Sequence, residues 1–231
     1  MKTPIDEIWF AAKNTQIVYM PPKLLETFGE TYVHYLVAAE DLDNPSVVHL
    51  HEGAVTAERP RIVTPQYYRR QMVENFGPDA QRYFDEVLAK DTSARFLQYG
   101  LKFSKQDYRT QTVAGQVREI AEQAAKDAQD NLAEVRGVVV GEADTWEISL
   151  LFFITQLVQR SFPHHAQDIA RRGLLDLQDG VPVGVRQEIE SELAACTTLE
   201  GARNLGAKLR DYGLFEQFED QFYELYRRVR A

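Results

Sequence analysis

The first part of the chain alternates short hydrophobic runs with turn residues, a pattern that is typical of β-strands. Thr31 to Glu40 is rich in aromatic and β-branched residues and predicts a strand. Asp41 to Pro45 favours a turn, and Val47 to Glu52 predicts a second strand after it. Gly53 indicates another tight turn, after which Ala54 to Glu58 predicts a third strand. The pattern therefore predicts an antiparallel β-meander.

From residue 64 onward, hydrophobic residues recur at the spacing of an amphipathic helix. A helix is predicted from Thr64 to Phe76, because Thr64 is a suitable N-cap and Pro65 suits the first turn. Longer helices are predicted over Asp107 to Arg136 and over Asp144 to Ser161, the most apolar of them. The other predicted elements are a helix over 5–12, a strand over 16–20, and helices over 78–90, 93–99, 163–177, 184–195, 198–211 and 214–230.

The predicted helix over 107–136 carries one continuous apolar stripe. Its members are Val113, Val117, Ile120, Ala124, Ala128, Leu132 and Val135. The alanines in the middle of the stripe would let another long helix approach closely. Val117 and Ile120 are therefore candidate residues of a helical interface.

The predicted terminal helix over 214–230 carries large aromatic side chains at helical spacing. They are Phe215, Phe218, Phe222 and Tyr226. A stripe of this kind usually packs into the core of its own chain. If the chain offers no partner for it, a second copy would cover it. These four are therefore candidate interaction residues, and we expect the protein to self-associate through helical surfaces.

Together these patterns predict an α+β fold that is mostly helical, with a small N-terminal antiparallel β-meander followed by a multi-helix bundle. The expected division places a β-rich region at residues 1–63 and the bundle at residues 64–231. Because the β-rich region is small, a single composite domain is the alternative.

Charge and cysteine content narrow the range of partners and locations. The 231 residues have a formal net charge of −9, and negative charge repels the phosphate backbone of nucleic acids. Cys196 is the only cysteine, so the chain cannot form an intramolecular disulfide, the feature that would favour a secreted protein. No apolar stretch is long enough to span a bilayer. We therefore expect a cytoplasmic protein that binds a protein partner or itself, and neither membranes nor nucleic acids.

Known catalytic and cofactor motifs are absent from the sequence. There is no phosphate-binding loop, dinucleotide-binding glycine pattern, nucleophile elbow or metalloprotease motif. Gly137 and Gly141 bracket three valines, but their spacing fits no phosphate site, and we interpret them as linker glycines. We therefore expect no cofactor.

Histidines concentrate in the predicted β-meander. If the apolar positions of the first two strands share one face, the opposite face carries His34, His49 and His51. A turn at Gly53 would bring Glu58 to the same face. Imidazole and carboxylate groups are common ligands of zinc and iron. His34, His49, His51 and Glu58 are therefore candidate metal ligands. Two alternatives remain for this face. It packs under helices, or it is a solvent-exposed sheet face on which the histidines have no common role.

The absence of catalytic motifs favours a non-enzymatic protein-interaction or regulatory module that self-associates. The alternative is a metal-dependent enzyme built on His34, His49 and His51. A third hypothesis is a helical protein that binds a small apolar ligand.

Overall fold

The structure is a computed structural model, and it describes residues 5–41, 43–62, 78, 82, 103–105, 108–178 and 181–230. These residues form two compact units. The first unit contains the described residues up to Pro60, residues 78 and 82, and those from Phe103 to His165. The second contains residues 61–62 and the described residues from Ala166 onward. The helices predicted over 64–76, 78–90 and 93–99 lie outside the described residues, apart from two isolated positions.

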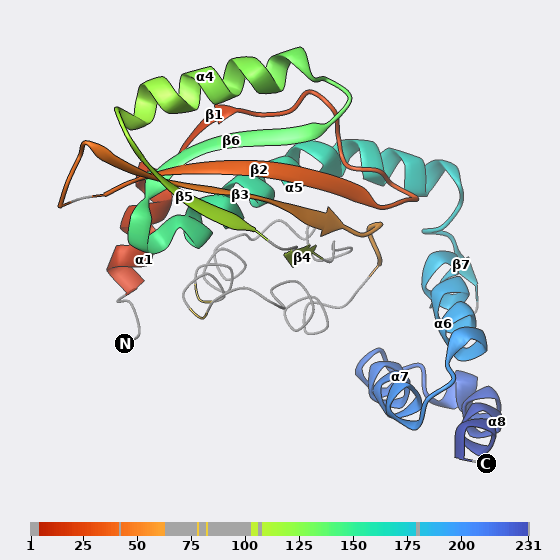
Figure 1. Cartoon of the computed structure of the whole chain (residues 1–231). Helices are drawn as coiled ribbons and strands as arrows, with labels where there is room; N and C mark the ends of the chain where they lie inside the picture. Colours follow the sequence, from red (N-terminus) through yellow and green to blue (C-terminus); the bar gives the residue numbers. More distant parts are fainter. Residues whose placement is uncertain are drawn as a thin grey trace. The chain divides into compact units, whose positions relative to one another are not determined.

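A mixed β-sheet forms the centre of the first unit (Figure 1). Its six described strands follow the order β1-β6-β2-β3-β4, and β5 pairs with β3 beside β4. β2 and β6 run parallel, whereas the other pairs are antiparallel. The strands are β1 (Gln16–Tyr19), β2 (Thr31–Glu40), β3 (Val47–Ala57), β4 (Phe103–Lys105), β5 (Arg109–Ala114) and β6 (Val135–Glu142).

The predicted three-stranded meander is wrong, because β3 continues through Gly53 as one strand. Gly53 lies opposite Tyr35 of β2. A Cβ atom at position 53 would lie 2.6 Å from the Tyr35 hydroxyl oxygen, so the glycine leaves room for the tyrosine ring across the strand. A close approach of this kind and a tight turn both call for glycine, and the sequence does not distinguish them.

The predicted helix over 107–136 is also wrong. That segment forms β5, then helix α4 (Val117–Asp130), and then β6. Gly115, between β5 and α4, has a φ of 151°, which favours glycine and interrupts any continuous helix. Gly137 and Gly141 are residues of β6 and not linker glycines. Because β5 and β6 run in the same direction, α4 is the crossover helix that connects them.

Helix α4 covers one face of the sheet (Figure 1). Its buried Ala121 and Ala128 pack in one cluster with Leu36 of β2. The small side chains do bring the helix close to its partner, but that partner is a sheet and not another long helix. Val117 and Ile120, the candidate interface residues, pack against this cluster within the same chain.

Helix α5 (Trp146–Arg171) covers the opposite face. A Cβ atom at Gly137 would overlap the Phe153 ring, and one at Gly141 would overlap Ser149. β2 and β6 are therefore covered on both faces. This is why residues 36–39 of β2 are all buried, instead of alternating between buried and exposed. The first unit also contains α1 (Ile5–Asn14) and the 3-10 turn η1 (Ala143–Thr145).

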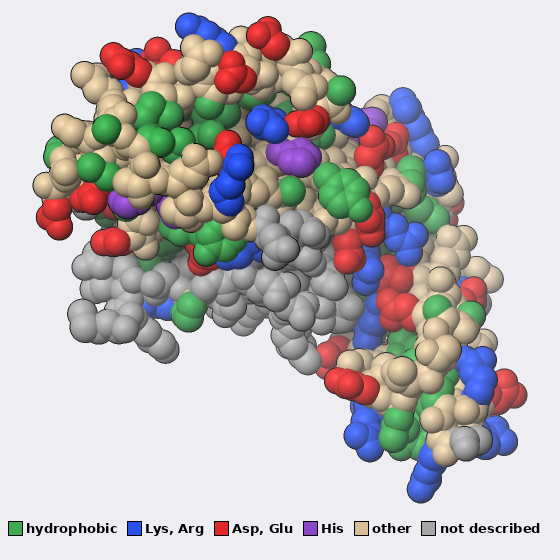
Figure 2. Space-filling model, in the orientation of Figure 1, with side chains coloured by type: hydrophobic (Ala, Val, Ile, Leu, Met, Phe, Trp, Pro, Cys, Tyr) green, Lys and Arg blue, Asp and Glu red, His purple; other side chains and the backbone are tan. Residues whose placement is uncertain are grey.

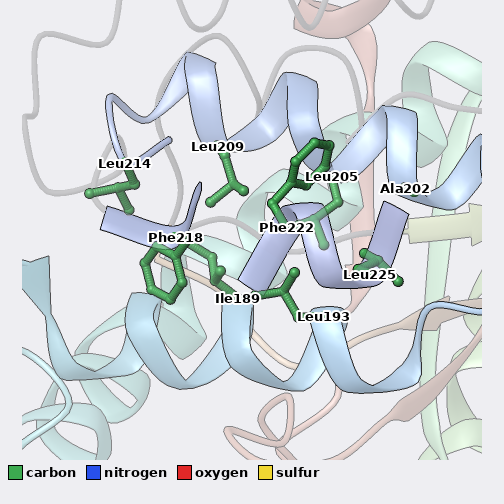
Figure 3. Close-up of a cluster of buried hydrophobic side chains, with 9 residues drawn as sticks. All are labelled: Ile189, Leu193, Ala202, Leu205, Leu209, Leu214, Phe218, Phe222 and Leu225. Atoms are coloured by element: carbon green, nitrogen blue, oxygen red, sulfur yellow. The ribbon is translucent and has the colours of Figure 1, made fainter. Parts of the chain in front are cut away.

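The second unit is helical. It contains α6 (Val183–Ala195), α7 (Leu199–Asp211) and α8 (Glu219–Arg230), with the end of α5, the strands β7 (Leu177–Gln178) and β8 (Val181–Pro182), and the 3-10 turn η2 (Glu216–Phe218). Its buried apolar cluster is drawn from these helices and the segment before α8 (Figure 3). The members are Ile189, Leu193, Ala202, Leu205, Leu209, Leu214, Phe218, Phe222 and Leu225.

This cluster accounts for the aromatic stripe of the terminal segment. Phe218 and Phe222 are buried in it, and Phe215 and Tyr226 are half-buried against it. The four candidate interaction residues therefore have apolar partners on α6 and α7 of the same chain. The stripe needs no second copy to cover it, so it does not by itself indicate self-association.

A buried ion cluster also joins α6 to α7. The ammonium group of Lys208 is almost completely buried and lies 2.7 Å from carboxylate oxygens of both Glu188 and Glu192. Burial lowers the pKa of Lys208, but the charges and hydrogen bonds of the two glutamates outweigh it and raise the pKa overall. The lysine therefore stays charged in a largely apolar setting.

In outline the structure confirms a chain that combines helices with a β-sheet, but the sheet is mixed, and the helices among the described residues form no single bundle. β5 and β6 lie beyond residue 64 and still belong to the central sheet. The compact units therefore do not divide at the boundary expected between residues 63 and 64. None of the helices in the described ranges is long and apolar enough to cross a membrane.

We expect Gly137→Ala to lower the free energy of unfolding of the first unit by about 2 kcal/mol or more, because the added methyl group overlaps the Phe153 ring. Gly29→Ala is the matched control, since the nearest atom to a Cβ there is 3.8 Å away. We expect it to change stability by less than about 0.5 kcal/mol. Urea denaturation followed by tryptophan fluorescence measures this, because Trp9 and Trp146 both lie in the first unit. Equal stability of the two variants would contradict the close packing of α5 on β6.

Candidate functional site

The strand register places the predicted metal ligands on different faces of the sheet. His34 of β2 lies opposite Ala54 of β3, whereas His51 lies opposite Val37. Cross-strand partners share a face, and facing alternates along each strand. His34 therefore faces the α4 side, while His49 and His51 face the α5 side. The predicted common face for the three histidines is wrong.

Burial on both faces of β2 explains this error. Apolar residues of β2 face both helices, so their alternation does not identify a single core face. The register follows instead from the connection between β2 and β3, which sets Glu40 opposite Val48.

His49 and Glu58, two more of the candidate metal ligands, differ in position and in neighbours. The Nε2 atom of His49 lies 3.5 Å from a carboxylate oxygen of Asp41. Glu58 lies beyond the end of β3, which is Ala57. Within the described ranges, no group of three or more His, Cys, Asp or Glu side chains is arranged so that it could hold a metal ion.

On the α5 side, His51 belongs to an aromatic cluster. Its ring stacks on the Trp146 indole, with ring centroids 4.3 Å apart and planes inclined by 4°. Its Nδ1 atom lies 3.1 Å from the hydroxyl oxygen of Thr110 in β5. The rings of Tyr35 and Tyr108 lie 6.4 Å and 5.1 Å from the same indole, centroid to centroid. Residues distant in the sequence thus surround the first residue of α5.

Two polar atoms of this cluster are buried without a hydrogen-bond partner among the described residues. They are the Tyr35 hydroxyl oxygen and the Nε2 atom of His51. The two residues are 2% and 7% exposed. Buried polar groups normally have partners, so these atoms distinguish the cluster from an ordinary apolar core.

Burial also controls the ionisation of both residues. Burial and the charge of His49 lower the pKa of His51 to about 4, and the Glu147 carboxylate opposes this only in part. Burial raises the pKa of Tyr35 well above its ordinary value, and Tyr108 and Glu147 contribute in the same direction. At neutral pH the cluster therefore contains a neutral imidazole and a neutral phenol.

A charged pair completes the cluster. Lys105 of β4 forms an ion pair with Glu147 of α5. Its ammonium nitrogen lies 5.3 Å from the Trp146 ring and 5.2 Å from the Tyr108 ring, within the range of cation–π contacts. Sequence reasoning missed this arrangement, because no local motif connects Lys105 of β4, Tyr108 just before β5, and Trp146 and Glu147 of α5.

On the α4 side, a groove of about 520 Å³ lies over the strands. Strand register explains why its polar side chains converge. Arg136 of β6 lies beside His34, and Arg109 of β5 lies beside Glu52 of β3. Figure 2 shows histidine, basic and acidic side chains together on the visible face of the sheet. The groove is lined by His34, Tyr35, Glu52, Gly53, Ala54, Tyr108, Arg109 and Arg136.

Acidic neighbours orient both arginines of the groove. Arg109 donates from Nη2 and Nε to one carboxylate oxygen of Glu52, at 2.5 Å and 3.2 Å. Arg136 donates from Nη2 to Glu134 at 3.1 Å. The arginine side chains remain 71% and 38% exposed, respectively. Tyr32, two residues before His34 and therefore on the same face, is 58% exposed.

The first unit therefore has two sites with unusual chemistry, a buried aromatic cluster around His51 and an open polar groove around His34. Comparisons with protein-family models, curated proteins and solved structures give no match for the chain. Function is therefore inferred from the geometry of these two sites.

We expect the low pKa of His51 to make the first unit less stable in mild acid. Below about pH 6.5 the unfolded chain binds a proton at this residue that the folded chain does not bind until about pH 4. The residue should therefore lower the free energy of unfolding by about 2 kcal/mol between about pH 7.5 and about pH 5. His51→Phe keeps a ring against Trp146 and removes this contribution.

Urea denaturation of the wild type and of His51→Phe at both pH values measures the difference. His164→Phe is the matched control, because His164 is exposed. Equal pH dependence in the wild type and in His51→Phe would show that His51 titrates normally in the folded protein.

Proposed function

We propose that the protein is a non-enzymatic interaction module that recognises a segment of a protein partner through the groove around His34. The observation that carries this proposal is the convergence of polar side chains from β2, β3, β5 and β6 on a partly exposed part of the sheet. Action in the cytoplasm belongs to the same proposal, on the ground that the single cysteine offers no disulfide.

The arginines indicate the chemistry of the partner. A guanidinium group has five N–H donors, and the contacts to Glu52 and Glu134 use only some of those of Arg109 and Arg136. Both side chains are held by these contacts, so less conformational entropy is lost when a carboxylate binds. Tyr and Arg are also the residue types that contribute most to binding at protein interfaces, and Tyr32 supplies an exposed aromatic ring nearby.

The alternation of charge favours a protein segment over a nucleic acid. Each arginine has a glutamate beside it, so the groove has no continuous run of positive charge for a phosphate backbone. The net charge of −9 opposes nucleic acid further. A segment with an acidic side chain for Arg136 and a basic or hydroxyl side chain for Glu52 would complement the groove.

The metal-dependent alternative is not retained. It needs His34 in one ligand set with His49 and His51, and the register separates His34 from the other two.

We expect peptides selected against the protein from an unbiased library to be enriched in Asp and Glu next to a basic or hydroxyl residue. Arg136→Gln should weaken their binding by roughly 10- to 100-fold, the effect of losing one hydrogen bond between charged groups. Arg118→Gln is the matched control, because Arg118 is an exposed arginine of α4 that also pairs with a glutamate, Glu122. Fluorescence anisotropy of labelled peptides measures all three affinities. Selected peptides without acidic residues, or equal weakening by the two variants, would contradict the proposal.

A further inference from the structure

Among the described strands, β5 lies at one edge of the sheet. It pairs with β3 on one side, and none of the described strands pairs with its other side. Five of its six residues are exposed, and Val113 is half-buried. Within the part of the chain that the structure describes, the outward N–H and C=O groups of its backbone therefore have no strand partner, and an edge strand of this kind can pair with a strand of another chain.

The opposite edge, β1, is protected in a way that β5 is not. β1 has only four residues, its pairing with β6 is irregular between Ile17 and Tyr19, and Pro21 and Pro22 follow it. Short length, irregular pairing and proline all prevent a sheet edge from pairing with another chain. β5 pairs with β3 in unbroken register and contains neither proline nor lysine.

We propose that β5 pairs antiparallel with β5 of a second copy of the chain, so that two sheets join across a two-fold axis. An antiparallel pair of identical strands is self-complementary and closes with two copies. A two-fold axis perpendicular to the sheet keeps each face of one copy continuous with the same face of the other. With Gln111 at the axis, Thr110 lies opposite the partner's Thr112, a pair that stabilises antiparallel strands.

The position of the charge on β5 favours a second copy in this orientation. Arg109 is the only charged residue of the strand and lies at one end. In the antiparallel pair it lies opposite the partner's Val113, so the two arginines are about 14 Å apart along the strands. A parallel pair would place them side by side, which is unfavourable.

This dimer goes beyond the proposed function, because it uses the edge of the sheet and its test needs no peptide. Light scattering of the full chain over about 1 to 100 µM should give twice the chain mass of 26.5 kDa. Gln111→Lys places two ammonium groups together at the axis and should weaken the dimer at least tenfold. Gln129→Lys, on an exposed position of α4, makes the same change of charge and should leave the dimer intact.

Cross-linking tests the register of the pair. In a Cys196→Ser background, Gln111→Cys places two thiols at the axis, where the Cα atoms of opposite residues are about 5 Å apart and a disulfide can form between copies. Gln129→Cys in the same background should not cross-link. Circular dichroism confirms that each variant is folded. A single-chain mass over the whole range overturns the proposal, as does a dimer that resists Gln111→Lys and does not cross-link at position 111.

Discussion

The parallel pairing of β2 with β6 is the constraint on which the rest of the first unit depends. Parallel neighbours cannot be joined by a tight turn, so a crossover must carry the chain over the sheet, and α4 is the helix of the crossover that leads into β6. Both strands are then covered on their two faces, by α4 on one side and α5 on the other. Gly137 and Gly141 make this double cover sterically feasible, because their missing side chains leave room for Phe153 and Ser149.

Helices α4 and α5 do not cover the two faces of the sheet equally, and both candidate sites follow from this difference. On the α4 side, Tyr32 and His34 at the start of β2 remain partly or largely exposed, and the arginines beside them keep their charge in contact with water. On the α5 side, Trp146 covers His51, and burial keeps that imidazole neutral. The same strands therefore present a charged groove to one side and a neutral, buried pair of polar groups to the other. Arginine and glutamate side chains supply the charge of the groove, whereas burial keeps His51 and Tyr35 neutral on the other side.

In the second unit, burial of apolar and charged side chains holds helices together. Its three helices are too short to be stable alone, and a shared apolar cluster holds them together. Lys208 adds a buried charge whose cost is offset by two carboxylates on α6. The aromatic residues from which the sequence predicts an interface therefore pack within the second unit itself.

The sequence by itself determined the elements whose signals are local. The helices near the C-terminus, the strand over 31–40 and the helical period of residues 117–128 all follow from side chains that meet within a few residues of one another. Tertiary structure decided the rest. Gly53 and Gly137 signal a turn or a linker in the sequence, yet each makes room for a ring that arrives from another element, Tyr35 and Phe153 respectively. The face to which His34 points depends on strand register, and a strand buried on both faces carries no alternation from which that register can be derived. The groove and the aromatic cluster therefore exist only in the folded chain, because each joins residues whose proximity is set by strand pairing and helix packing, and not by their spacing in the sequence.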